Sequence, residues 1–377
     1  MNYWKYDEEM KSEVKSALIL GAIVVVGVGI LSMIFSTYDE QFIPTKSKID
    51  TNFVGIDKSG FKKAPELVGI VHYLNTTPEK LNQEMEGKVV LYDIWTYSCI
   101  NCVRTLPYIT SWDEKYSDQG LLIIGIHSPE FEFEKNPENV KSAINKHGIH
   151  YPVVLDNDME TWKAFENRYW PRKYIADHEG YIRYDHIGEG GYKETEKIIQ
   201  QLLDERSKNI GIQSMSIKPL VDIEEFEHTM FRTPELYFGY KFAENRNQLG
   251  NSEGFQPEKI VTYSIQKSID LHKFYLSGDW KNHEDSMELI SKTGTIKLPY
   301  IAKQVNIVTK NNAQLEIFLD DKPLTEQNSG KDVLSKNILT VTNPDLYNII
   351  NNGDDLSHTI EIKIHGKGFQ IFTFTFG

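Results

Sequence analysis

Cysteine is nearly absent from this chain: its 377 residues include only Cys99 and Cys102. A structural zinc site takes about four ligands, and neither a second cysteine pair nor a histidine at ligand spacing accompanies these two. No metal centre is therefore predicted. A structural disulfide between them would close a tiny loop and remove little chain entropy, so that interpretation is weaker. Dithiol–disulfide exchange is the favoured interpretation, with no cofactor beyond the pair's own redox-active disulfide.

Basic residues are fewer than acidic residues in this chain. The chain has 41 Lys and Arg against 54 Asp and Glu, a net charge of −13. This balance argues against nucleic acid as a main partner. It is typical of a soluble acidic domain and names no partner by itself.

Charge is missing altogether between Ser16 and Tyr38, and the interior of this stretch is apolar. At about 1.5 Å per residue it can cross about 30 Å of hydrocarbon, so residues 17–36 are predicted to be a transmembrane anchor. A cleaved signal peptide is the alternative, but no Ala-x-Ala-like site follows. More lysines precede the span than follow it closely, which favours a cytoplasmic N-terminus at 1–16 and an extracytoplasmic remainder, beginning with a stalk at 37–60.

The cysteine pair lies between a predicted strand and a predicted helix. Residues 88–95 are rich in β-forming types, and residues 103–109 have a helical pattern. Unpaired N–H groups and the helix dipole would stabilise a thiolate on Cys99 at the helix N-terminus. Because only the thiolate attacks a disulfide, Cys99 is the predicted nucleophile.

An α/β domain is predicted over residues 61–209, since strands and helices alternate there. The expected strands cover 89–95, 121–127, 151–156, 172–177 and 181–186, and the expected helices cover 137–147, 160–169 and 194–209. A linker at 210–230 follows. With the anchor removed, the remaining length suits two globular domains.

Short alternating strands dominate residues 231–377, which predicts an all-β sandwich. Phe372, Phe374 and Phe376, for example, are expected to share one face. Trp280 is expected in the core, with a sugar-stacking role as the less favoured alternative.

The segment from Trp95 to Cys102 (Trp-Thr-Tyr-Ser-Cys-Ile-Asn-Cys), followed by Thr105-Leu106-Pro107, resembles the active site of thioredoxin-fold proteins of the TlpA type, in particular the extracytoplasmic region of DipZ-like proteins. The resemblance runs from about Ala64 to the C-terminus. It implies a thioredoxin-like domain followed by a jelly-roll domain similar to a carbohydrate-binding module, which makes a glycan a candidate partner. Fold similarity alone does not confer sugar binding.

The resemblance also implies roles for the residues around the pair. Cys102 would be the resolving thiol, and Asp93, buried on the strand, would take its proton. Trp95 would pack beneath the site, and Pro171 would be the cis-proline that faces the sulfurs. The backbone before Pro171 would pair with an extended peptide, which adds Trp170 and Trp95 to the expected substrate surface.

Three further residues are named with alternative interpretations. Arg172, with Lys173, forms a basic pair that either favours acidic partners or is a solvated strand end. Glu130 is either a surface acid or a carboxylate that faces the site. Thr96 precedes Cys99 by three residues, as in part of the peroxiredoxin signature, but Tyr92 stands where that signature has proline.

The expected function is that of a membrane-anchored, extracytoplasmic thiol–disulfide oxidoreductase, with reduction of partner proteins favoured over their oxidation. DipZ-like relatives carry a membrane electron-conducting domain on the same chain, so a separate membrane thiol-electron donor is an expected partner here. Cytochrome c biogenesis is the family's usual association. A thiol peroxidase and a non-enzymatic cell-surface binding protein are the rival interpretations.

Overall fold

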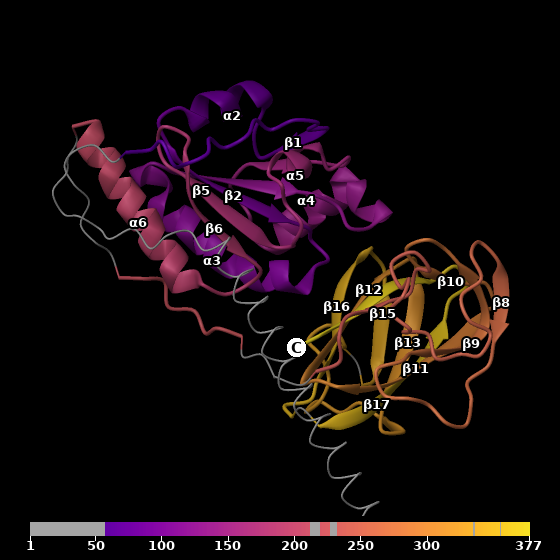
Figure 1. Ribbon diagram of the computed structural model, residues 1–377. Helices are drawn as coiled ribbons and strands as arrows, with labels where there is room; N and C mark the ends of the chain where they lie inside the picture. The colour runs from indigo at the N-terminus through magenta and orange to yellow at the C-terminus, as the bar shows by residue number, and fades with distance from the viewer. Residues whose placement is uncertain (1–56, 212–218, 227–231, 335, 355) are drawn as a thin grey trace, which may run out of the picture. The chain divides into compact units, whose positions relative to one another are not determined.

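A computed structural model describes residues 57–211, 219–226, 232–334, 336–354 and 356–377 (Figure 1). The predicted anchor at 17–36, most of the predicted stalk and part of the predicted linker lie outside these residues. Within the described ranges, no helix combines the length and apolar character needed to cross a membrane.

The first sheet is built around β2 (Val89–Trp95), the strand that leads to the cysteines. Its neighbours are the parallel strand β3 (Leu121–His127) and the antiparallel strand β5 (Arg172–Ala176). The order is β1-β4-β3-β2-β5-β6, completed by β1 (His72–Leu74), β4 (Val153–Leu155) and β6 (Ile182–Ile187). All seven residues of β2 are buried, as in a strand that is covered on both faces.

Helices cover both faces of this sheet. One core packs side chains of α3 (Ile100–Tyr116), α4 (Pro137–Lys146) and α6 (Tyr192–Asn209) against one face. Another core packs α2 (Pro78–Met85) and Phe165 against the opposite face. This is the α/β arrangement that the alternating pattern predicted, and Figure 1 shows it with the helices on either side of β2 and β5.

The predicted helix at 160–169 is wrong in length. The structure has only α5 (Glu160–Ala164), because Glu166 adopts a left-handed conformation with φ 52° and ends the helical path. The Asn167 N–H then donates to the carbonyl of Trp162. β1 and α2 were not predicted, nor were two 3₁₀ turns, η1 (Ser117–Gln119) and η2 (Glu132–Lys135).

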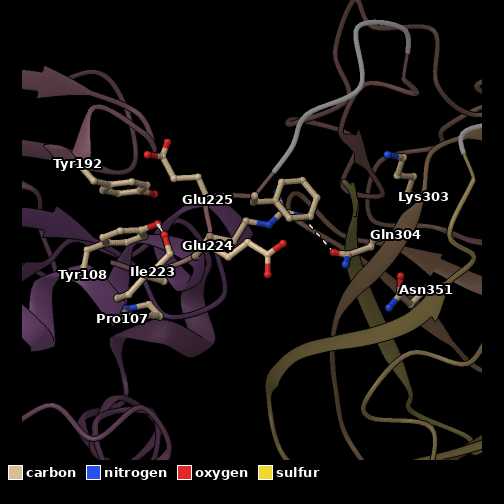
Figure 2. Close-up of a pocket in the computed structure, with 11 residues that line it drawn as sticks. Pro107, Tyr108, Tyr192, Ile223, Glu224, Glu225, Lys303, Gln304 and Asn351 are labelled. Carbon is tan, nitrogen blue, oxygen red and sulfur yellow. Dashed lines mark hydrogen bonds between the residues drawn. The ribbon is translucent and has the colours of Figure 1, made fainter. Parts of the chain in front are cut away.

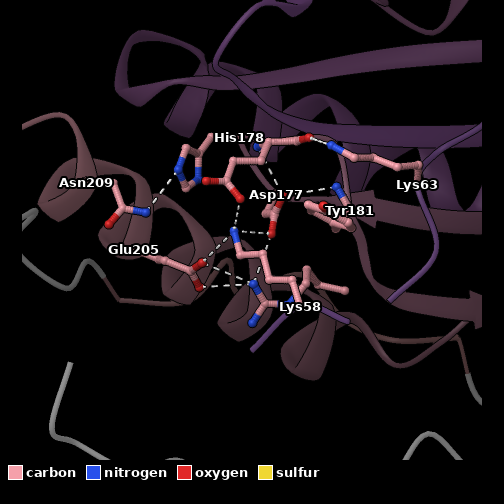
Figure 3. A network of polar contacts seen from close by, with 9 residues as sticks. Lys58, Lys63, Asp177, His178, Tyr181, Glu205 and Asn209 are labelled. Carbon is pink, nitrogen blue, oxygen red and sulfur yellow. Dashed lines mark hydrogen bonds and ion pairs between the residues drawn. The ribbon is translucent and has the colours of Figure 1, made fainter. Parts of the chain in front are cut away.

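Lys58, near the beginning of the described chain, forms ion pairs with this domain (Figure 3). Its Nζ lies 2.9 Å from an oxygen of Asp177 and 3.4 Å from Glu205 on α6. Arg183 on β6 contacts the same two carboxylates, each at 3.1 Å. Residues from Lys58 to Gly377 form one compact unit.

A twelve-stranded antiparallel sheet forms the rest of the chain and curls around one apolar core (Figure 1). β9 connects its two halves: its first residues pair with β11, and its later residues pair with β8 and β10. The strands are β7 (Leu236–Tyr237), β8 (Ile260–Tyr263), β9 (Tyr275–Asn282), β10 (Met287–Leu289), β11 (Thr293–Ile301), β12 (Gln304–Lys310), β13 (Ala313–Leu319), β14 (Lys322–Pro323), β15 (Ile338–Val341), β16 (Asp345–Asn351), β17 (Ser357–His365) and β18 (Gln370–Phe376).

Phe372 does not share a face with Phe374 and Phe376 as predicted. The register between β12 and β18 shifts at this point, so that Val308 pairs with Thr373 and Thr309 with Ile371. The extra residue of this bulge is Phe372, and a bulge reverses the side-chain alternation. Its ring therefore leaves the β core and packs 4.7 Å from the Phe133 ring of the thioredoxin-like part.

Candidate active site

Cys99 is the N-cap residue of α3, with an extended backbone that leads from β2 into the helix. Its sulfur-bearing side chain is partly exposed, whereas Cys102, one turn into the helix, is 1% exposed. Both are free thiols in this structure. A macromolecule in solution can therefore reach Cys99 but not Cys102.

Burial raises the pKa of the Cys102 thiol well above its usual value, and hydrogen bonding with Cys99 adds to this effect. The Thr96 backbone acts in the opposite direction. Cys102 therefore needs a base before it can act as a nucleophile.

Asp93 is a buried carboxyl group that could serve as this base. It lies on β2, is 1% exposed, and has one carboxylate oxygen without a hydrogen-bond partner among the described residues. Burial raises the pKa of Asp93 to about 7, although the charge of Lys173 acts to lower it. A carboxyl group with this pKa can both accept and release a proton near neutral pH.

Lys173 is not part of a solvated strand end, so that interpretation of the basic pair is wrong. It is fully buried and stands opposite Asp93 in the β2–β5 register. Its Nζ donates to the carbonyl of Gly188 at 3.1 Å. Burial lowers the pKa of Lys173 to about 8, while Asp93 and Cys102 act to raise it.

Trp95 and Thr96 are both fully buried, so Trp95 cannot contribute to the substrate surface as predicted. Trp95 belongs to the core beneath the cysteines. The Thr96 hydroxyl donates to Glu134 at 2.5 Å rather than being available at the surface. With Tyr92 in place of a proline, this arrangement gives no support to the peroxidase interpretation.

Glu134 connects the segment that precedes Cys99 to the loop before η2. One of its oxygens accepts from the hydroxyls of Thr96 and Ser98, and the other accepts from the N–H groups of Glu130 and Phe131 at 2.6 and 2.9 Å. The carboxylate thereby holds the loop before η2 against the segment that precedes Cys99. His127 lies 3.3 Å from the Thr96 hydroxyl, and burial lowers the His127 pKa to about 3, which keeps the ring neutral.

The peptide bond between Trp170 and Pro171 is cis. The Trp170 indole N–H donates to the carbonyl of Ser128 at 3.0 Å, and its ring packs at a tilt against Trp162, with ring centres 4.3 Å apart. Arg172 already pairs with Asp185 at 2.6 Å, so its charge is not free to recruit an acidic partner.

Glu130 is not the exposed surface acid of the first interpretation. It is partly buried, and one of its carboxylate oxygens lies 2.9 Å from the hydroxyl of Tyr237 of the β-sheet part. The β-sheet part contacts this side of the site at other points as well: the Tyr97 hydroxyl donates to the carbonyl of Pro344.

A cavity of about 410 Å³ lies further along α3 (Figure 2). The stacked rings of Tyr108 and Tyr192 form one side of it, with Lys303 and Gln304 opposite. Neither cysteine lines it, nor do Asp93 and Pro171. This cavity is therefore separate from the thiol chemistry.

Sequence reasoning missed the contributions of Lys173, Glu134 and Tyr237. The partner of Lys173 depends on strand pairing, and Glu134 is one of three alternating glutamates in its segment. Tyr237 is 107 residues away from Glu130 in the sequence. No local pattern could have selected these three.

Two family models match the chain: Redoxin over residues 62–203, and a thioredoxin like C-terminal domain over residues 233–377. The thiol–disulfide oxidoreductase YkuV of Bacillus subtilis is 34% identical over 143 residues, which cover 37% of this chain and 94% of YkuV. This chain belongs to the thioredoxin-fold thiol–disulfide oxidoreductases of the TlpA and DipZ-like type.

This oxidoreductase is also similar to the protein DipZ of Mycobacterium bovis, with 35% identity over 317 residues. The match covers 83% of the present chain but only 43% of DipZ, so the chain spans less than half the length of that relative. The solution structure of a thioredoxin-like protein in its oxidised form is 32% identical, with a TM-score of 0.35, and the match covers 38% of this chain and 97% of that one.

Proposed function

We propose that this oxidoreductase reduces disulfides in extracytoplasmic partner proteins while anchored to a membrane through residues 17–36. Cys99 attacks the substrate disulfide, and Cys102 resolves the mixed disulfide after Asp93 has taken its proton. The observation that carries the proposal is the contrast between the partly exposed Cys99 at a helix N-cap and the buried Cys102 near a buried carboxyl group.

The domain limits of the proposal follow the sequence pattern: a thioredoxin-like domain at 61–209, a linker at 210–230 and a jelly-roll domain at 231–377. The substrate would lie across Trp170 and Pro171, next to the thiols. Trp280 is fully buried and cannot stack on a sugar. Any glycan recognition by the β domain would have to use other residues.

Trapping tests the catalytic part. In the full chain, Cys102→Ser should accumulate mixed disulfides with partner proteins, because the second attack is blocked. The matched control is the Cys99→Ser, Cys102→Ser double variant, which should form none. If adducts form equally in both variants, or in neither under reducing and oxidising conditions, the oxidoreductase mechanism at Cys99 is wrong.

Labelling tests the location. A membrane-impermeant maleimide added to intact cells should modify Cys99 of the reduced full-length protein, and the protein should sediment with the membrane fraction. Labelling that requires cell lysis would place the thiols on the other side of the membrane and remove the extracytoplasmic part of the proposal.

A further inference from the structure

Two carboxylates meet at one tyrosine hydroxyl where the thioredoxin-like part contacts the β sheet. The Tyr237 hydroxyl lies 2.9 Å from an oxygen of Glu130 and 2.9 Å from an oxygen of Glu235. A phenol has one proton and can donate to only one of them. The other contact is a hydrogen bond only if that carboxyl group is itself protonated. A proton shared by the two glutamates makes both contacts hydrogen bonds.

The surroundings reinforce this requirement. Burial and the mutual repulsion of the two carboxylates raise the pKa of Glu130 well above its usual value, and Glu134 and Cys99 add to the rise. Burial also raises the pKa of Glu235, against the effects of Tyr237 and Arg246. The Arg246 guanidinium lies 4.8 Å from the centre of the Tyr237 ring. One negative charge is thus stable here, and two are costly.

The position of the pair connects it to the reactive thiol. Glu134 accepts hydrogen bonds from Ser98, next to Cys99, and from the backbone N–H of Glu130. The Glu134 carboxylate therefore bridges the segment of Cys99 and the segment of Glu130. Charge on Cys99 is close enough to act on Glu130.

We propose that Glu130, Tyr237 and Glu235 form a proton-holding carboxyl pair that takes the proton of Cys99 when its thiolate forms. Glu235 and Tyr237, from the β-sheet part, are then positioning residues for the thiol chemistry. This inference rests on the proposed function of Cys99 as the attacking thiol.

The proton and electron balance is as follows. The Cys99 proton moves to the pair, the thiolate attacks the substrate disulfide, and the first substrate sulfur leaves with a proton from the pair. Cys102 gives its proton to Asp93 and attacks Cys99, and the second substrate sulfur leaves and takes that proton. Two electrons pass from the two cysteines to the substrate disulfide, which is the oxidant. The negative charge near Cys99 alternates between sulfur and carboxylate throughout.

The test measures the rate of Cys99 alkylation by iodoacetamide against pH. It uses the full chain with Cys102→Ser, in which Cys99 is the only thiol. Glu130→Gln removes the carboxylate nearer to the sulfur, so the midpoint of the profile should fall by roughly one pH unit. Glu235→Gln frees Tyr237 to donate to Glu130, which fixes the charge close to Cys99, so the midpoint should rise.

Opposite shifts are the signature of the pair, because a general loosening of the fold would move both profiles in one direction. Glu132→Gln is the matched control, since Glu132 is exposed in the same loop and pairs with Lys135. The inference is overturned if Glu130→Gln and Glu132→Gln give the same profile, or if both pair variants shift it in one direction.

A spectroscopic measurement covers the case in which one variant fails to fold. The infrared difference spectrum between reduced and oxidised wild-type protein should contain a protonated carboxyl band that Tyr237→Phe alters. An unaltered band would count against the pair. Alkylation by a small reagent does not need a protein substrate, so these results are independent of whether trapping identifies partners.

Discussion

Lys173 stands directly opposite Asp93 on the paired strands β5 and β2, and both side chains are buried. Two opposite shifts result from this burial: the pKa of Asp93 rises to about 7, and that of Lys173 falls to about 8. Each residue reduces the other's shift. The lysine therefore helps to set the pH at which Asp93 can accept the proton of Cys102, against the larger effect of burial.

Replacing Lys173 by Met should raise the pKa of Asp93 further above 7, because the cation that lowers it is gone. At pH 7 Asp93 would then be mostly protonated and unable to accept a proton. Resolution of the mixed disulfide should slow at neutral pH, and the acid limb of its pH profile should move up by about one unit or more. Stopped-flow kinetics and a carbon-13 titration of the Asp93 carboxyl would measure both effects.

Lys193→Met provides the control, since Lys193 is exposed on α6. Its profile should match that of the wild type. Equal Asp93 titrations in all three proteins would show that Lys173 has no part in setting the proton acceptor.

The raised pKa of Asp93 also predicts how the stability of the protein changes with pH. The folded protein holds the Asp93 proton up to about pH 7, whereas the unfolded chain releases it near the ordinary value of 3.8. Between these values the folded state binds more protons, so Asp93 makes the free energy of unfolding fall as pH rises, by about 1.4 kcal/mol per unit and about 4 kcal/mol in total. Above pH 7 Asp93 is ionised in both states, and the free energy of unfolding falls no further on its account.

The Asp93→Asn, Lys173→Met double variant removes both titrating groups and should lack this fall. Urea unfolding at several pH values between 4 and 7 measures the slope, with exposed Asp158→Asn as the control. A double variant with the wild-type slope would mean that Asp93 ionises at an ordinary pH in the folded state.

The sequence was sufficient to predict those parts of the fold and the site that depend on local pattern. The strand at 89–95, the helix after the cysteines and the alternation of β-sheet residues are all present in the structure. Trp280 is in the core, as expected. These features follow from periodicity and turn chemistry, which act over a few residues.

The rest depends on pairing between distant segments. For Lys173 the sequence left open a basic pair that favours acidic partners and a solvated strand end, because burial of this residue follows only from the register with β2. Phe372 was placed on the wrong face because a bulge against β12 cannot be seen in one strand. Glu130 faces a tyrosine that the chain supplies 107 residues later.

Glu134 should be one of the most sensitive positions for stability outside the apolar cores. Glu134→Ala leaves the donors of Thr96, Ser98, Glu130 and Phe131 without their acceptor in a buried site. We expect a loss of at least about 3 kcal/mol in the free energy of unfolding, since unsatisfied buried donors cost about 1–3 kcal/mol each. Urea unfolding monitored by tryptophan fluorescence measures this loss. Exposed Glu132→Ala should stay within about 0.5 kcal/mol of the wild type, and similar losses in both variants would contradict a special role for Glu134.

Lys58 should stabilise the protein at neutral pH but not in acid. Burial alone would raise the pKa of Asp177, yet Lys58, the Tyr181 N–H and Arg183 together hold it below its usual range. A depressed carboxyl pKa contributes stability above the unfolded value of 3.8, and the contribution is lost as pH falls through the folded pKa. Lys58→Met should therefore cost about 1–2 kcal/mol at pH 7, as expected for hydrogen bonds to a charged group. At pH 3 and below, the difference from the wild type should shrink.

Lys62→Met is the matched control for Lys58→Met, because Lys62 is 82% exposed and pairs only loosely with Glu166 at 3.4 Å. If Lys58→Met lost the same free energy at both pH values, its effect would come from packing of the lysine chain rather than from the ion pair with Asp177.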